Sequence, residues 1–183
     1  MYVRLKPERS GRFCRLTWRV KLPGILIIGY GNASRGDDAV GLHAARQLER
    51  QFRDDPEIEI ISSHQLTPEM ADDISRSELV IFLDASCDGA PGTVRCKPIV
   101  EEGLPGGFTH HLSPAALISA AEQLYGEAPT AMSITLTGWS FELGGKLSSA
   151  AQGQLPELLR RTREVIASHR TAHATLGSTS RVG

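Results

Sequence analysis

Five side chains in this 183-residue sequence are best placed to do chemistry, and they fall into three groups. Asp37 and Asp38 are adjacent and follow an apolar run and a turn of small residues. Asp84 ends a second apolar run, and His110 and His111 precede a helix start. Two carboxylates and an imidazole, with coordination positions left open, suit a borderline divalent transition metal better than Mg²⁺ or Ca²⁺, which favour all-oxygen shells.

Each group also has a purely structural interpretation. An acid at a helix start is stabilised by the helix dipole, so one of Asp37 and Asp38 is expected as a capping residue. Histidines before a cap, such as His110 and His111, can simply be solvated. Asp84 is harder to explain in this way, because a carboxylate that ends five apolar residues is costly unless it is paired or ligating.

Strands that alternate with helices must position these side chains. The expected strands cover residues 25–28, 57–61, 79–83, 93–100 and 131–137. The expected helices cover residues 38–52, 68–75 and 114–125 and a final segment around 155–166, kinked or split by Pro156. This alternation predicts a doubly wound α/β fold, in which ligands collect at the carboxyl ends of the strands.

The length predicts one domain, flanked by two segments of different composition. We expect residues 1–22 to form a basic, flexible extension, residues 23–168 to form the domain, and residues 169–183 to form a polar, frayed tail. The first 21 residues carry seven basic side chains and one acidic one. The rest of the chain has 13 Lys and Arg against 20 Asp and Glu, which argues against a nucleic-acid partner.

Composition also bears on the compartment. No apolar run approaches the length of a membrane span, and the N-terminus lacks the apolar core of a signal peptide. The three cysteines form no CxxC pair. We therefore expect a reduced, cytoplasmic protein with no membrane partner that acts as a monomer.

Two common kinds of site do not fit the pattern. Gly29 and Gly31 begin a GxGxxG motif, but the sixth position is Ser34, and the two acids that follow would repel a pyrophosphate. No GxSxG motif is present, and Cys87 lies in a turn without an evident base, so a Ser or Cys triad is unsupported.

Four segments together resemble the maturation endopeptidases of nickel–iron hydrogenases. In chain order they are Gly29-Tyr-Gly-Asn32 with Gly36-Asp-Asp-Ala-Val-Gly41, Leu83-Asp-Ala85, Pro91-Gly92 and His110-His-Leu112. The likeness covers about Ile25 to Ile166. The run from His64 to Glu69 resembles one branch of that family, although His64 itself is expected to have a supporting role or to lie on the surface.

The resemblance implies a fold, an activity and a site. The fold is a single three-layer α/β domain of the phosphorylase/hydrolase-like kind, with a twisted, mainly parallel five-stranded sheet and helices on both faces. The activity is removal of a C-terminal peptide from the hydrogenase large-subunit precursor after nickel insertion. The family's metal-binding positions map onto Asp38, Asp84 and His110, with His111 as the reserve, and these three are the expected metal-binding and catalytic residues. The implied metal is nickel carried by the precursor, or another divalent transition metal.

Two alternatives remain open from the sequence. The same three side chains would also suit a non-enzymatic nickel carrier or assembly chaperone. For an enzyme, the water could be activated by the metal or by a carboxylate acting as base, and either fits the absence of a protein nucleophile.

Overall fold

The computed structural model describes residues 24–100, 112–126 and 128–179, with side chains up to residue 175. The predictions for residues 1–22, His110 and His111 therefore lie outside the described residues. Five strands form one sheet in the order β2-β1-β3-β5-β4. The strands are β1 (Ile25–Tyr30), β2 (Ile58–Ser63), β3 (Leu79–Ser86), β4 (Val94–Pro98) and β5 (Thr130–Thr137).

The sheet is parallel except at one edge. β1 pairs with both β2 and β3, and β3 pairs with β5, all in parallel, whereas β4 runs antiparallel to β5. The central strands are almost continuous aliphatic runs, as expected where helices cover both faces. Pro98 lies in the edge strand β4, where its missing N–H leaves no unpaired position inside the sheet.

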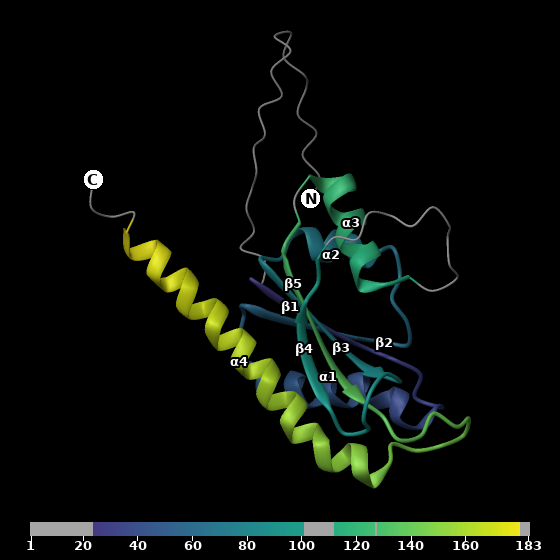
Figure 1. Cartoon of the computed structure of the whole chain (residues 1–183). Helices are drawn as coiled ribbons and strands as arrows, with labels where there is room; N and C mark the ends of the chain where they lie inside the picture. The colour runs from purple at the N-terminus through teal and green to yellow at the C-terminus, as the bar shows by residue number, and fades with distance from the viewer. Residues whose placement is uncertain (1–23, 101–111, 127, 180–183) are drawn as a thin grey trace.

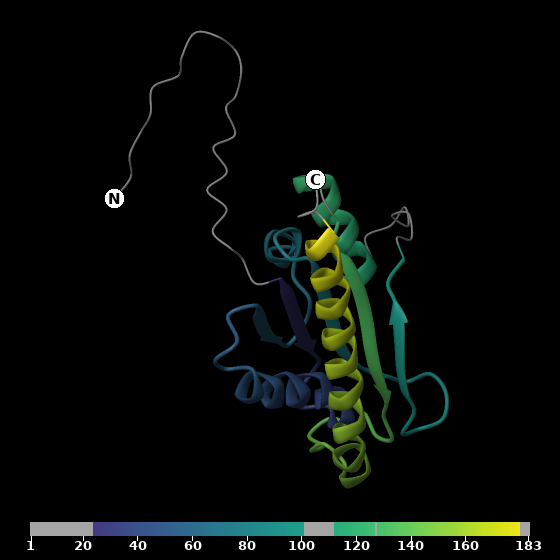
Figure 2. The same ribbon diagram turned by 90° about the vertical axis from the view of Figure 1, so that its left-hand side faces the viewer.

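Helices cover both faces of the sheet and make three layers (Figures 1 and 2). On one face, α1 (Val40–Gln51) and α4 (Ser149–Thr179) pack against one set of strand side chains. On the other face, α2 (Met70–Ser75) and α3 (Pro114–Tyr125) pack against the alternate set. The predicted three-layer α/β domain is confirmed.

Helix α1 lies unusually close to the sheet at its first turn. A Cβ atom on Gly41 would lie 2.3 Å from the carbonyl oxygen of Leu83 and 2.4 Å from that of Tyr30. A Cβ atom on Gly29 would lie 2.3 Å from the carbonyl oxygen of Gly41. Two facing glycines thus bring the start of α1 against the carboxyl ends of β1 and β3.

Several element boundaries differ from the predicted ones. α4 is continuous through Pro156, so the predicted split is wrong, and it runs on to Thr179, so the predicted fraying from residue 169 is wrong up to that point. α2 starts at Met70, after a turn in which its N–H donates to the carbonyl of Thr67. β3 continues to Ser86, which places Asp84 within the strand.

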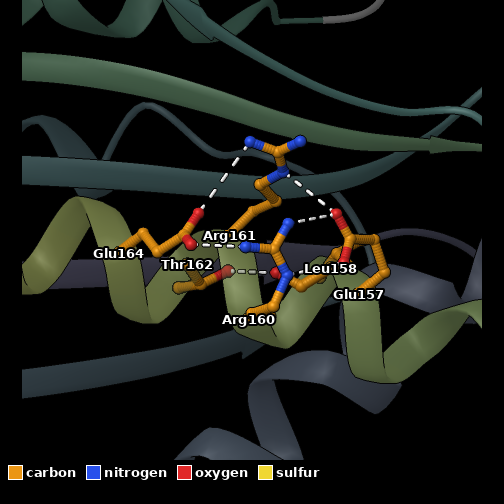
Figure 3. A network of polar contacts seen from close by, with 6 residues as sticks. All are labelled: Glu157, Leu158, Arg160, Arg161, Thr162 and Glu164. Atoms are coloured by element: carbon orange, nitrogen blue, oxygen red, sulfur yellow. Dashed lines mark hydrogen bonds and ion pairs between the residues drawn. The ribbon is translucent and has the colours of Figure 1, made fainter.

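The outer surface of α4 carries a network of ion pairs one helical turn apart (Figure 3). Arg160 and Arg161 both contact Glu157, and Arg160 also contacts Glu164. On the inner side, the buried hydroxyl of Thr162 donates to the carbonyl of Leu158 at 2.9 Å. The apolar face of α4, from Ala151 to Ile166, packs against the sheet, and the charged face is directed to solvent. Within the described part of the chain, no helix combines the length and the hydropathy needed to cross a membrane.

Candidate functional site

A cleft of about 500 Å³ opens at the carboxyl ends of β1 and β3. Asp38 and Asp84 both line it, as the sequence predicted for residues at the ends of parallel strands. The other lining residues are Tyr30, Gly31, Asn32, Arg35, His64, Gln65, Leu66, Thr67, Pro68 and Leu112.

The loop after β1 delivers Asp38 to the cleft. The loop ends in a 3₁₀ turn, η1 (Gly36–Ala39), that leads directly into α1. The backbone N–H of Asn32 donates to Asp38 Oδ2 at 2.9 Å and so fixes the carboxylate across the loop. Gly31 has a φ of 139°, and a Cβ there would lie 1.9 Å from the carbonyl oxygen of Asp38. Only glycine fits that position.

β3 delivers Asp84 to the same cleft. Burial raises the pKa of Asp84 to about 6. Hydrogen bonds from the Tyr30 hydroxyl and from the N–H of Ala85, at 2.7 Å, oppose this rise, whereas the negative charge of Asp38 adds to it. The two carboxylates are thus near enough to interact, and one of them is close to half-protonated near pH 6.

Tyr30 is a member of this site that the sequence prediction missed. Its hydroxyl donates to Asp84, and burial together with the charges of Asp84 and Asp38 raises its pKa, so it stays a neutral donor. No local pattern in the sequence marks it, because its contact with Asp84 depends on the order of the strands in the sheet. β1 and β3 are neighbouring parallel strands, so the residue that ends β1 lies beside the end of β3.

Asp37 does not share the cleft. It is fully buried, and its carboxylate accepts hydrogen bonds from the N–H groups of Trp139, Ser140 and Ser148 and from the Ser148 hydroxyl, at 2.8–3.2 Å. Burial alone would raise the pKa of Asp37, but these hydrogen bonds hold it below its ordinary value. Asp37 therefore fastens the loop before α4, and it makes no side-chain cap on its own helix.

The remaining wall of the cleft includes the segment after β2 and Leu112, two residues before α3. His64 is exposed and lines the cleft with its neighbours up to Pro68. Leu112 also lines the cleft, and it follows His110 and His111 in the chain.

The two described carboxylates form a donor set that can hold a divalent cation. In each carboxylate one oxygen accepts a backbone N–H, Asp38 Oδ2 from Asn32 and Asp84 Oδ1 from Ala85, and the Tyr30 hydroxyl also donates to Asp84. Two acids in one cleft repel each other when both are ionised, and a bound cation removes that cost.

Solved structures with the same fold include hydrogenase maturation enzymes. The chain aligns with the maturation protease HycI of Thermococcus kodakarensis with a TM-score of 0.65 and 23% identity, covering 79% of this chain and 93% of that one. It aligns with the maturating endopeptidase HybD of Escherichia coli with a TM-score of 0.62 and 26% identity, covering 81% and 93%.

Sequence comparison reaches the same group of proteins. No model of a known protein family matches the chain. The hydrogenase 2 maturation protease of Escherichia coli K12 is 30% identical over 120 residues, which span 62% of this chain and 71% of that protein. With the shared fold and the acid-lined cleft at the strand ends, this similarity shows that the chain belongs to the hydrogenase maturation proteases.

Proposed function

We propose that this peptidase removes the C-terminal extension of a nickel–iron hydrogenase large-subunit precursor, and that it does so only once nickel has been inserted. The observation that carries the proposal is the placement of the Asp38 and Asp84 carboxylates in one cleft, where both can be ligands to a cation. In this proposal the nickel arrives with the precursor, and His110 is the third ligand.

The geometry also suits water attack on a peptide bond. A carboxyl with a pKa of about 6 is mostly ionised at pH 7, yet it accepts a proton more readily than an ordinary aspartate. Tyr30 donates to this carboxylate and holds its orientation. The nickel held by the precursor would supply Lewis-acid polarisation. An Asp84 carboxylate that ligates it would be held ionised, so Asp84 acts as the base only where the nickel leaves it unligated.

Processing of a purified precursor tests the proposal. Asp38→Asn and Asp84→Asn should each fold and leave the C-terminal extension attached, a loss of at least 100-fold in cleavage rate, because an amide ligates a cation poorly and cannot act as a base. Mass spectrometry of the large subunit measures the cleaved fraction. Wild-type cleavage by either variant would contradict the assignment.

A second comparison tests the role of nickel. Nickel-loaded precursor should be cleaved, whereas nickel-free precursor should stay intact with the same enzyme. Equal cleavage of both would show that the enzyme does not sense the metal. No loss of mass from either precursor, together with transfer of nickel, would instead identify a carrier.

A further inference from the structure

A second cluster of metal-binding side chains lies away from the cleft. Glu78, His169 and His173 each present one ligand atom, and within the described residues these atoms all lie within 4.8 Å of one another. They line a cavity of about 380 Å³ beside Gly24 and Ile25. Glu78 precedes β3, whereas both histidines belong to α4.

The cluster lies at the amino-terminal ends of the strands, whereas Asp38 and Asp84 lie at their carboxyl ends. Glu78 and Asp84 flank the buried part of β3, and the five residues from Leu79 to Leu83 separate them by roughly 20 Å. The two cavities share no lining residue. An ion bound by Glu78 would thus be independent of the site proposed for nickel.

The two distances from Glu78 to the histidines suit the ligands of a tetrahedral ion. Glu78 Oε2 lies 3.5 Å from His173 Nδ1 and 3.7 Å from His169 Nε2. Both distances exceed the usual N–H···O range. They are close to the edge of a tetrahedron with ligands at 2.0–2.1 Å from zinc, about 3.4 Å.

The backbone holds these side chains in place. The N–H groups of Glu78 and Leu79 both donate to the carbonyl of Gly24, at 2.9 and 3.0 Å, and the carbonyl of Glu78 accepts from Thr130 at 3.1 Å. Glu78 is thereby tied to the starts of β1 and β5.

Helix α4 positions the two histidines of the cluster, His169 and His173. They are four residues apart, so both project from one face of the helix, as in helical zinc-binding pairs, and their ring centroids are 4.2 Å apart. The His169 side chain is only 13% exposed.

The charge around the cluster also permits a cation. Arg170 lines the same cavity, but its guanidinium is engaged by Asp55 at 2.6 Å. Glu57 adds a second carboxylate to the wall.

We propose that Glu78, His169 and His173 bind one divalent ion of the zinc class and thereby fasten α4 to the amino-terminal edge of the sheet. Two imidazoles and one carboxylate are ligands that zinc prefers. Three protein ligands leave the fourth position to water, as the exposure of Glu78 and His173 allows.

Zinc titration of the full chain without a histidine tag tests this proposal. The starting protein is the Asp38→Asn/Asp84→Asn variant, stripped of metal, so that the cleft site cannot dominate the signal. Calorimetry with ZnCl₂ at pH 7.5 should show one equivalent bound, and the melting temperature should rise with zinc concentration. Adding His173→Gln should weaken zinc binding at least tenfold and remove most of the shift in melting temperature.

His43→Gln is the matched control, because His43 is a half-buried histidine on α1 outside the cluster. It should leave the zinc affinity unchanged. Circular dichroism checks that each variant is folded, and His173 is exposed, so its replacement should not disturb the core. The proposal is overturned if the starting protein binds no zinc, or if His169→Gln and His173→Gln both leave the affinity unchanged.

Discussion

Adjacent carboxylates in this protein have opposite tasks. Asp37 is fully buried with four hydrogen bonds from residues 139–148, whereas Asp38 faces the cleft with one backbone donor. The difference arises from the 3₁₀ turn that contains both, which points successive side chains in different directions. Two identical side chains at neighbouring positions thus have different surroundings, one in the interior of the fold and the other at the cleft.

The neighbouring acids should give contrasting variants. Asp37→Asn turns an amide NH₂ toward N–H donors, so we expect it to lower the free energy of unfolding by about 2–4 kcal/mol. Asp38→Asn keeps an oxygen for the Asn32 N–H and should change stability by less than about 1 kcal/mol, although we expect it to stop processing. Urea denaturation of both variants checks this. Equal stabilities would show that the Asp37 hydrogen bonds contribute little.

Asp84 should make the stability of the metal-free protein depend on pH. Its pKa is about 6 in the fold, against about 3.9 for an exposed aspartate. The folded state therefore binds more protons between these values. The stabilising contribution of the neutral carboxyl is complete below about pH 4 and is lost as the pH rises through 6, a change of about 3 kcal/mol.

Asp84→Asn isolates this effect because the amide does not titrate. As the pH rises from 4 to 7, the wild type should lose about 3 kcal/mol of stability from Asp84, and the variant should not. The free energy of unfolding of the variant, minus that of the wild type, should therefore rise by about 3 kcal/mol over this range. Urea denaturation at both pH values, with a chelator present, measures the difference. A constant difference would mean that the carboxyl titrates near its ordinary value.

At the scale of elements, the site depends on how closely α1 approaches the sheet. The facing glycines Gly29 and Gly41 allow the helix to start directly over the ends of β1 and β3, from which Tyr30 and Asp84 reach the cleft. A larger side chain there would push the helix away and shift the loop that carries Asp38.

Gly41→Ala should therefore lower the free energy of unfolding by about 1–3 kcal/mol, because its methyl group would overlap two carbonyl oxygens. Gly153→Ala is the control. Gly153 lies in α4, and an added Cβ would meet nothing within 4 Å, so alanine should stabilise the protein by about 0.5–1 kcal/mol. Thermal denaturation compares the two, and equal effects would contradict the close-packing interpretation.

At the scale of the whole molecule, α4 covers one face of the sheet through its apolar side rather than through its surface charges. Leu158 is fully buried in the core shared with α1 and the strands. The neighbouring Glu157 forms its ion pairs on the outer surface (Figure 3). Exposed ion pairs contribute little because water screens them.

Leu158→Ala should accordingly cost about 2–5 kcal/mol of stability, from lost apolar burial and the cavity that remains. Glu157→Gln should leave the urea midpoint unchanged within the error of the measurement. A large loss from Glu157→Gln would show that the ion-pair network holds the helix in place.

The sequence predicted the α/β layers and the position of the cleft at the carboxyl ends of the strands, but not the contacts made by the loops. Aliphatic runs and helical spacing are local patterns, so the alternation of strands and helices could be read directly. The task of Asp37 depends on donors more than 100 residues away, and the hydrogen bond from Tyr30 depends on strand order. Such long-range contacts leave no local pattern in one sequence. The cluster of Glu78, His169 and His173 had one local signal, the four-residue histidine spacing, and it fell in a segment expected to fray.

The hydrogen bonds of Asp37 also impose an order on folding during synthesis. The chain emerges from its N-terminus, so the loop that carries Asp38 is made long before Trp139, Ser140 and Ser148. Until those donors are made, the Asp37 carboxylate remains hydrated. The loop before the first helix can therefore gain these four hydrogen bonds only after residues 139–148 have been synthesised.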